Sequence, residues 1–464
     1  DEAKINALGY EPIKGDLYKI KSISTKSDLV KLTAYMHSYS IYPIFYAGGT
    51  IDAKNSEYTI AILYQSGLGL PDKNYYFNED ERSKAVREEY QKQIGRMLSL
   101  IGYDETTANS KAKIIYEIEL KLADISYTKA DLQVPAKNYN KMTLKELIAL
   151  SGGFDWALYF KEFGLPEPGD INIAQKPYFE GLGKVFEQVS LDDWKYYFEW
   201  VLLRSNANLL SSNIVEQNFE FSGKFMSGLK EMRPRWKRVT DVVNGSLGDV
   251  LGELYVEKYF PPSSKKRVLE LVENLRLALK DRIQKLTWMS DVTKQNAIEK
   301  LEKITVKIGY PDKWKDYSSL DIDRNTYFEN VKRTRHFDFL KNLKKIGKPV
   351  DKSEWGMTPQ TVNAYYSSTR NEIVFPAGIL QPPFFWADAD DAVNYGAIGV
   401  VIGHETTHGF DHRGRQFDKD GNMKDWWTED DAKNFEKQTQ VLVDQFNNYK
   451  LLDTLHVDGK LTLG

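Results

Sequence analysis

The sequence predicts a mainly α-helical protein with a smaller part in which helices and strands mix. Two observations carry this prediction. Apolar residues recur every three to four positions over long stretches in the middle of the 464 residues, which is the spacing of amphipathic helices. Short runs rich in β-branched and aromatic residues occur near the beginning and again after residue 360, which is typical of strands.

The first predicted strands lie at residues 41–49 and 58–64. Both runs are apolar, and the polar turn D-A-K-N-S-E lies between them. This arrangement predicts a strand pair. A loop follows at residues 66–72, because two glycines and a proline interrupt the pattern there.

Residues 76–317 are predicted to form a mostly helical block. Its clearest stripe consists of Val268, Leu271, Val272, Leu275, Leu279, Ile283 and Leu286. Two prolines precede this stripe, and Ser263 or Ser264 can cap the helix. A coiled coil is the alternative, but the stripe lasts too few heptads, so we expect a helix packed in a core.

The last part of the chain alternates between extended and helical patterns. Residues 361–368 and 371–377 are predicted to be extended. Residues 387–411 begin with aspartates suited to capping and continue as an apolar helix. A turn-rich loop at 416–427 leads to another predicted helix at 428–449.

Composition excludes several classes of protein. The 63 lysine and arginine residues nearly balance 66 aspartate and glutamate residues, for a net charge of −3. This balance argues against a nucleic-acid partner bound by bulk charge. No apolar run approaches the roughly 18 residues of a membrane span. The absence of cysteine excludes disulfides, thiolate metal sites and cysteine nucleophiles.

The histidines point to chemistry, because three of the six lie within nine residues, at 404, 408 and 412. The sequence H-E-T-T-H occupies 404–408. On a helix, His404 and His408 face the same side and can bind one zinc ion. Glu405 lies beside that position, where it suits a general base. Chance would produce this motif on the order of 0.005 times in such a chain.

A solvated helix face is the alternative interpretation of this motif. The preceding residues 395–403 are almost wholly apolar, however, which predicts a buried helix. Buried imidazoles and a buried carboxylate need partners, and a metal ion can serve all of them. His412 is not expected to join them, because it would lie about 12 Å from His404 along the helix axis. We expect it at the rim of the site.

Asp411 lies one turn beyond His408 on the same predicted face. It could accept a hydrogen bond from the ring N–H of a ligand histidine, as carboxylates beside metal sites often do. It could instead cap the helix, or bind the metal itself. The sequence leaves these three roles open.

Three segments around the motif are distinctive: N-A-Y-Y (363–366), V-I-G-H-E-T-T-H-G-F-D (401–411) and G-R-Q-F-D-K-D-G (414–421). Others are Q-S-G-L-G-L-P-D-K-N-Y-Y (65–76), P-R-W-K-R (234–238), L-G-E-L-Y-V-E-K-Y-F-P (251–261) and K-I-G-Y-P-D-K-W (307–314). Together they resemble the neprilysin and endothelin-converting enzyme family of zinc metallopeptidases, and the likeness extends along most of the chain.

The resemblance implies a thermolysin-like zincin catalytic domain joined to an inserted helical domain, with an enclosed cavity between them. Residues 1–75 and 318–464 would then belong to the catalytic domain, and residues 76–317 to the helical domain. The resemblance also implies that Asn363 and Ala364 hold the backbone of the substrate. An extended edge segment suits this role, because a peptide can join it as an extra strand.

In the family, the third zinc ligand is a glutamate of an E-N-x-x-D motif that follows a stretch like L-T-L-G, where this sequence ends. We therefore expect an incomplete catalytic domain, with the third ligand supplied by a separate or following segment. Animal members carry disulfides. Because this chain has no cysteine, we expect a bacterial member that is periplasmic, secreted or lipid-anchored.

These observations predict a zinc endopeptidase that binds one zinc ion and hydrolyses oligopeptides. His404 and His408 would hold the zinc, and Glu405 would activate a zinc-bound water. Without a glutamate-bearing segment, two histidines bind zinc weakly. The alternative is therefore a protein that binds peptides without cleaving them.

Overall fold

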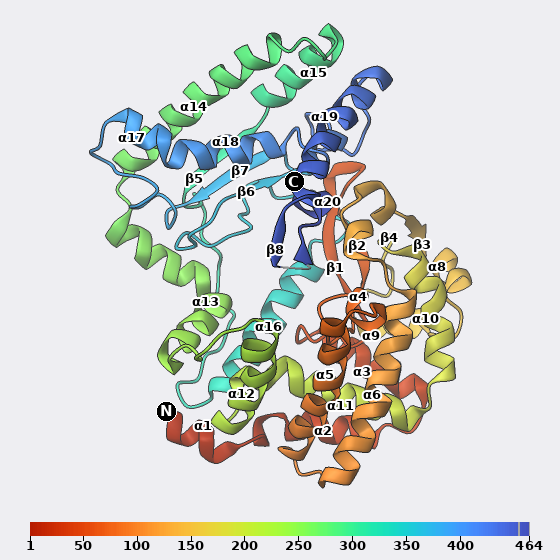
Figure 1. Cartoon of the computed structure of the whole chain (residues 1–464). Helices are drawn as coiled ribbons and strands as arrows, with labels where there is room; N and C mark the ends of the chain where they lie inside the picture. The colour runs from red at the N-terminus through yellow and green to blue at the C-terminus, as the bar shows by residue number, and fades with distance from the viewer. Residues whose placement is uncertain (453–454, 464) are drawn as a thin grey trace.

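The computed structural model describes residues 1–452 and 455–463, most of which are helical (Figure 1). The helices of the first part are α1 (Glu2–Leu8), α2 (Glu11–Ser22), α3 (Lys26–His37), α4 (Asn74–Phe77), α5 (Glu81–Ser99), α6 (Glu105–Ile125), α7 (Lys129–Leu132), α8 (Leu144–Leu150), α9 (Trp156–Glu162), α10 (Lys176–Gln188), α11 (Leu191–Asn206) and α12 (Ser212–Phe219). A π-helix at Glu220–Met226 continues α12.

The remaining helices follow in the second half of the chain. They are α13 (Arg235–Tyr259), α14 (Pro262–Gln284), α15 (Asp291–Glu302), α16 (Tyr327–Leu343), α17 (Asp391–Gly396), α18 (Ile398–His408), α19 (Glu429–Asn447) and α20 (Gly459–Thr462). Short 3₁₀ helices lie at Pro135–Asn138, Ala207–Leu209 and Gly414–Gln416. The predicted stripe of seven apolar residues lies on α14 or directly after it.

Strands make up a small share of the described residues. A four-stranded sheet has the order β1-β2-β4-β3, with β1 (Phe45–Asp52), β2 (Asn55–Gln65), β3 (Lys141–Thr143) and β4 (Asp170–Ile173). A three-stranded sheet has the order β5-β7-β6, with β5 (Thr305–Gly309), β6 (Tyr365–Ser367) and β7 (Glu372–Pro376). β8 (Lys450–Leu452) pairs with β9 (Leu455–His456). The predicted pair at 41–64 is the antiparallel hairpin β1–β2.

The predicted serine cap of α14 is wrong. The helix begins at Pro262, with Pro261 at the N-cap position and no side-chain hydrogen bond there. Proline suits the first helical position because its backbone angle is already helical and its missing N–H would have no partner. The helix therefore starts before Ser263, and both serines lie inside its first turn. Thr428, by contrast, caps α19, accepting a hydrogen bond from the backbone N–H of Asp431.

The first core consists of buried side chains between residues 13 and 214, together with Phe328 and Val331 of α16. The largest fully buried side chains of this core are Trp156, Trp194, Trp200, Tyr90, Tyr159, Tyr178, Tyr197, Phe45, Phe160, Phe179, Phe186 and Phe198. Fully burying one large apolar side chain stabilises a fold by about 1.5–3 kcal/mol. Aromatic side chains therefore supply much of the buried surface of this core.

The second core lies between residues 256 and 402. It joins α14, α15 and α18 to the sheet β5-β7-β6, and α18 runs close to that sheet and to α14 (Figure 1). Strand β7 is its centre, since all five of its residues are buried. This core positions α18, which carries the H-E-T-T-H motif.

Helix α13 and the β1–β2 hairpin each connect the two cores. Helix α13 has non-helical backbone angles at Leu247 (φ −129°, ψ 32°). Val242, before this kink, packs on the first core, and Val256, after it, belongs to the second core. The tip of the β1–β2 hairpin also reaches the loop after α18. Ser56 donates from its backbone N–H to Asn422 Oδ1 (2.8 Å) and from its hydroxyl to the Asp420 carbonyl (2.6 Å).

Candidate metal and peptide site

The predicted helix 387–411 is two helices, α17 and α18. Ala397 separates them with φ −110° and ψ −92°, and α18 ends at His408. Asp390 occupies the N-cap position of α17, but its side chain makes no capping hydrogen bond. Gly396 precedes the break, and glycine disfavours helix interiors. His412 therefore does not continue a stripe of three histidines, because the chain leaves the helix after His408.

The two motif histidines face each other at the end of α18. Their Nε2 atoms are 3.0 Å apart, and the ring planes are inclined by 80°. Two nitrogens that each bind a tetrahedral zinc ion at 2.0–2.1 Å would lie roughly 3.3 Å apart. The pair of imidazoles therefore fits one zinc ion with only a small adjustment.

Asp411 contacts His408 directly. Its Oδ2 lies 2.8 Å from His408 Nδ1, and this hydrogen bond raises the pKa of His408 above its ordinary value. Asp411 Oδ1 accepts hydrogen bonds from the backbone N–H groups of Arg413 (2.8 Å) and Gly414 (2.6 Å). One carboxylate thus both holds the turn after α18 and orients His408. With Nδ1–H donated to Asp411, Nε2 of His408 presents its lone pair to a metal.

Glu405 is 6% exposed and lies between α18 and strand β6. Burial raises the pKa of its carboxyl, while His408, His404 and a hydrogen bond from the backbone of Tyr366 act in the opposite direction. A raised pKa brings a carboxylate closer to the range in which a general base works well at neutral pH.

Asn363 and Ala364 directly precede β6, at an outer edge of the sheet β5-β7-β6. Asn363 is exposed, and its Oδ1 accepts a hydrogen bond from the backbone N–H of Ala364 (2.9 Å). Tyr365 and Tyr366 continue the segment and pair with Val374 and Ile373 of β7. Strand β6 therefore pairs with β7 along one of its edges, and its other edge is an outer edge of the sheet.

The prediction that α18 is a buried helix is only partly correct. Ile398 and Ile402 belong to the second core, but Val400 is 65% exposed and His404 is exposed as well. Sequence could not separate these faces, because every residue from 398 to 403 is apolar or glycine. Within residues 1–452 and 455–463, no group of three metal-binding side chains converges.

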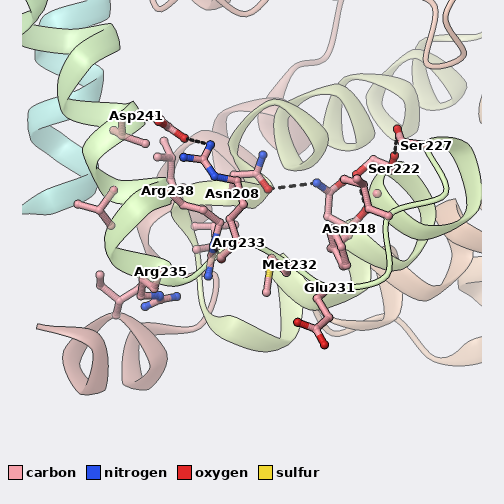
Figure 2. A pocket seen from close by; sticks show the side chains of 18 of the residues that line it. Asn208, Asn218, Ser222, Ser227, Glu231, Met232, Arg233, Arg235, Arg238 and Asp241 are labelled. Atoms are coloured by element: carbon pink, nitrogen blue, oxygen red, sulfur yellow. Dashed lines mark hydrogen bonds and ion pairs between the residues drawn. The ribbon is translucent and has the colours of Figure 1, made fainter. Parts of the chain in front are cut away.

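A separate pocket of about 610 Å³ lies between α12, the π-helix that follows it and the start of α13 (Figure 2). Arg233, Arg235 and Arg238 line it, and Arg233 forms an ion pair with Asp241 at 2.7 Å. None of its lining residues comes from α18 or β6. This pocket is therefore distinct from the site around His404 and His408.

Comparison with known proteins places the chain in a family. Sequence profiles of peptidase family M13 match residues 1–311 and residues 363–464. The chain belongs to peptidase family M13. Two relatives in this family are endothelin-converting enzyme 1 of Homo sapiens and neprilysin of Oryctolagus cuniculus. These matches confirm the resemblance recognised in the sequence.

Both M13 relatives are 34% identical to the chain. The alignment with endothelin-converting enzyme 1 covers 92% of this chain and 57% of the relative, and that with neprilysin covers 89% and 58%. The chain thus spans somewhat more than half the length of these curated relatives. Among the described residues, no helix is long and apolar enough to cross a membrane.

Solved M13 structures show the same fold. The Mycobacterium tuberculosis zinc metalloprotease Zmp1 in complex with an inhibitor matches with a TM-score of 0.95 and 38% identity, covering 100% of this chain and 71% of that one. PepO from Lactobacillus rhamnosis matches with a TM-score of 0.88 and 26% identity, covering 100% of this chain and 74% of that one. The predicted fold class is confirmed. The open state of Zmp1 matches with a TM-score of 0.81 and 39% identity.

Proposed function

We propose that this M13 chain is the zinc-binding part of an endopeptidase that hydrolyses short peptides. The observation that carries the proposal is the facing pair of Nε2 atoms of His404 and His408, 3.0 Å apart, with the buried carboxylate of Glu405 on the same helix. Membership of a peptidase family and similarity to a protein named a zinc metalloprotease support it.

The two histidines would hold one zinc ion, with Asp411 fixing the ring of His408. When bound, zinc supplies Lewis acidity that polarises the scissile carbonyl and lowers the pKa of water. Glu405 would accept the proton of the attacking water and later pass it to the leaving amine. Its burial favours this role because a carboxylate with a raised pKa is a stronger base.

Asn363 and Ala364 would bind the peptide backbone. They stand at the edge of the β5-β7-β6 sheet, and residues 365–367 of β6 run beside α18. A peptide that adds to this edge as a further strand would lie along α18, close to Glu405. The extended backbone of a short peptide fits this geometry.

A catalytic zinc site needs three protein ligands, and the described residues bring two imidazoles together. We propose that a glutamate from outside these residues completes the site. The same observation favours a second candidate function, a protein that binds peptides and releases them intact. The predicted domain boundaries and the predicted location outside a bacterial cytoplasm stay predictions.

Substitution of Glu405 by glutamine tests the mechanism. We expect zinc content to stay the same, while hydrolysis of a fluorogenic peptide falls by at least about 100-fold, because the general base is lost. Glu429→Gln is the matched control, since Glu429 is 83% exposed on α19. Full activity in Glu405→Gln would contradict the mechanism. Recovery of intact peptide from the unmodified protein, with no cleavage product in mass spectrometry, would favour the second candidate.

A further inference from the structure

One buried lysine is not explained by the proposed chemistry. Lys300 lies near the end of α15 and is 1% exposed. Its Nζ donates to three backbone carbonyls, those of Gly409 (2.7 Å), Gly414 (2.8 Å) and Phe417 (2.6 Å). An ammonium group has three N–H bonds, so each can reach one of these carbonyls.

The three acceptors belong to one short segment, residues 409–417, which begins directly after the ligand His408. This segment contains Asp411, whose carboxylate joins the backbone N–H of Gly414 to Nδ1 of His408. Lys300 therefore bonds the segment on both sides of Asp411, at positions 409 and 414. Hydrogen bonds from an ionised donor are stronger than neutral ones, so the clamp is strongest when Lys300, whose pKa burial lowers to about 7, carries its proton.

Close packing shows that the segment has little freedom. A Cβ atom added to Gly414 would lie 1.8 Å from the carbonyl oxygen of His408, so the backbone at 414 rests directly on the end of α18. Trp426 donates its Nε1–H to the Phe417 carbonyl (2.9 Å), which also accepts from Lys300. The loop is thus pressed against the helix that carries the histidines.

Lys300 also connects this loop to the peptide-binding segment. The Asn371 side chain donates to the carbonyl of Lys300 (3.1 Å) and accepts from the hydroxyl of Tyr366 (2.9 Å). Tyr366 belongs to the segment N-A-Y-Y. The side chain of Lys300 thus contacts the segment after the predicted zinc ligand, and its backbone carbonyl contacts the predicted substrate strand through Asn371.

We infer that Lys300 is a positioning residue that sets zinc affinity, by clamping the 409–417 segment so that Asp411 holds His408 in its ligand orientation. This inference rests on the proposed zinc-binding function. Lys300 touches neither the metal nor the substrate and acts through Asp411. Groups that orient metal ligands commonly contribute 10- to 100-fold to metal affinity.

The test compares Lys300→Met with Lys307→Met in the full-length protein. Lys307 is the matched control: its side chain is 10% exposed, and its Nζ contacts Glu372 (2.7 Å) and the Glu354 carbonyl (2.8 Å), outside the segment. Zinc affinity is measured by competition with a chromophoric chelator. We expect Lys300→Met to weaken it by roughly 10- to 100-fold, and Lys307→Met to leave it nearly unchanged. Equal losses in both variants would overturn the inference.

A double-mutant cycle with Asp411→Asn shows whether Lys300 acts through Asp411. We expect the variant with both changes to bind zinc about as well as Asp411→Asn alone. Once residue 411 no longer orients His408, loss of the Lys300 side chain has no further effect on the ligand. If the free-energy losses in zinc binding of the two single variants added up in the double variant, the proposed clamp would be contradicted. Lys300→Gln, which keeps two N–H donors, is measured alongside and expected between Lys300→Met and the unmodified protein.

Amide hydrogen exchange separates this inference from the proposed function, because it needs neither zinc nor turnover. In the zinc-free protein, Lys300→Met should speed exchange in residues 409–417 and leave strand β7 unchanged. Unaltered exchange in 409–417 would overturn the clamp even if the protein is a peptidase. Faster exchange in a protein that cleaves no peptide would support the clamp and reject the proposed function.

Discussion

The first core buries the rings of Trp156, Trp194 and Trp200 to 2% exposure or less, whereas the second core region buries Lys300 and Glu372 to the same degree. The first core gains its stability mainly from apolar surface, which is not directional. Lys300 and Glu372 instead need partners at particular distances, and each has them. The difference teaches that the two regions fail in different ways. Around the three tryptophans, loss of packing weakens the fold, whereas around Lys300 and Glu372, loss of one partner misplaces the other.

Trp194→Ala should have the largest effect on stability. Trp194 is fully buried and donates its Nε1–H to the Phe186 carbonyl (3.2 Å). Removing such a side chain leaves a cavity and costs about 3–5 kcal/mol, which urea unfolding measures. If the two regions are independent, the zinc affinity of the folded protein stays the same. If Trp194→Ala also lowered zinc affinity, the two regions would not be independent.

Asp411→Asn should show the opposite behaviour. We expect zinc affinity to fall by roughly 10- to 100-fold, because Asn cannot hold His408 as a charged acceptor does. Stability should change much less than in Trp194→Ala, since Asp411 is partly exposed at the end of a helix. Chelator competition and urea unfolding on the same samples give both values. A large loss of stability with normal zinc affinity would assign Asp411 to capping alone.

Acid titration should show a smaller effect, centred on Asp431. Burial raises its pKa, but hydrogen bonds from Ser290, Thr293 and Thr428 outweigh burial and lower it from 3.8 to about 2. A lowered pKa means that Asp431 stabilises the fold above pH 4 and that this contribution, about 2 kcal/mol, disappears as pH falls towards 2. Asp431→Asn should lose this part of the pH dependence in thermal unfolding.

Glu119 in the first core supplies the contrast for that titration. Burial raises the pKa of its carboxyl, and Arg204 with the hydroxyls of Tyr76 and Tyr90 offsets this only in part. A raised pKa means that its contribution to stability decreases as pH rises above its ordinary value. These two carboxyls should therefore contribute to the pH dependence of stability with opposite signs. If Asp431→Asn and Glu119→Gln changed the pH dependence of stability in the same direction, this distinction would be wrong.

Much of the fold follows from local pattern. The strand pair at 41–64 and the helical stripe at 268–286 were predictable because a single strand or helix face repeats within a few residues. The zinc motif was predictable for the same reason, since His404 and His408 are one helical turn apart. What sequence missed depends on distant partners. The end of α18 at His408 depends on the loop that Lys300 and Asp411 hold, whose partners lie far apart in the sequence.

Lys300 itself left one signal in the sequence. Buried residues of α15 and its end recur at Ala297, Leu301 and Ile304, and Lys300 falls at the same three- to four-residue spacing. A lysine on an apolar helix face is unusual and predicts a buried partner. Its neighbours, E-K-L-E-K, made it look like one of several surface charges. Which carbonyls it binds could not be predicted, because they lie more than 100 residues later.

The contact between the β1–β2 hairpin and the loop after α18 constrains the order in which the protein can assemble. Ser56 bonds to Asn422, and 366 residues separate them. A ribosome adding about 5–20 residues per second needs roughly 20 to 70 s to cover that distance. During this interval the hairpin tip has been synthesised, but its partner Asn422 has not. The contact beside α18 can therefore form only after Asn422 has been synthesised.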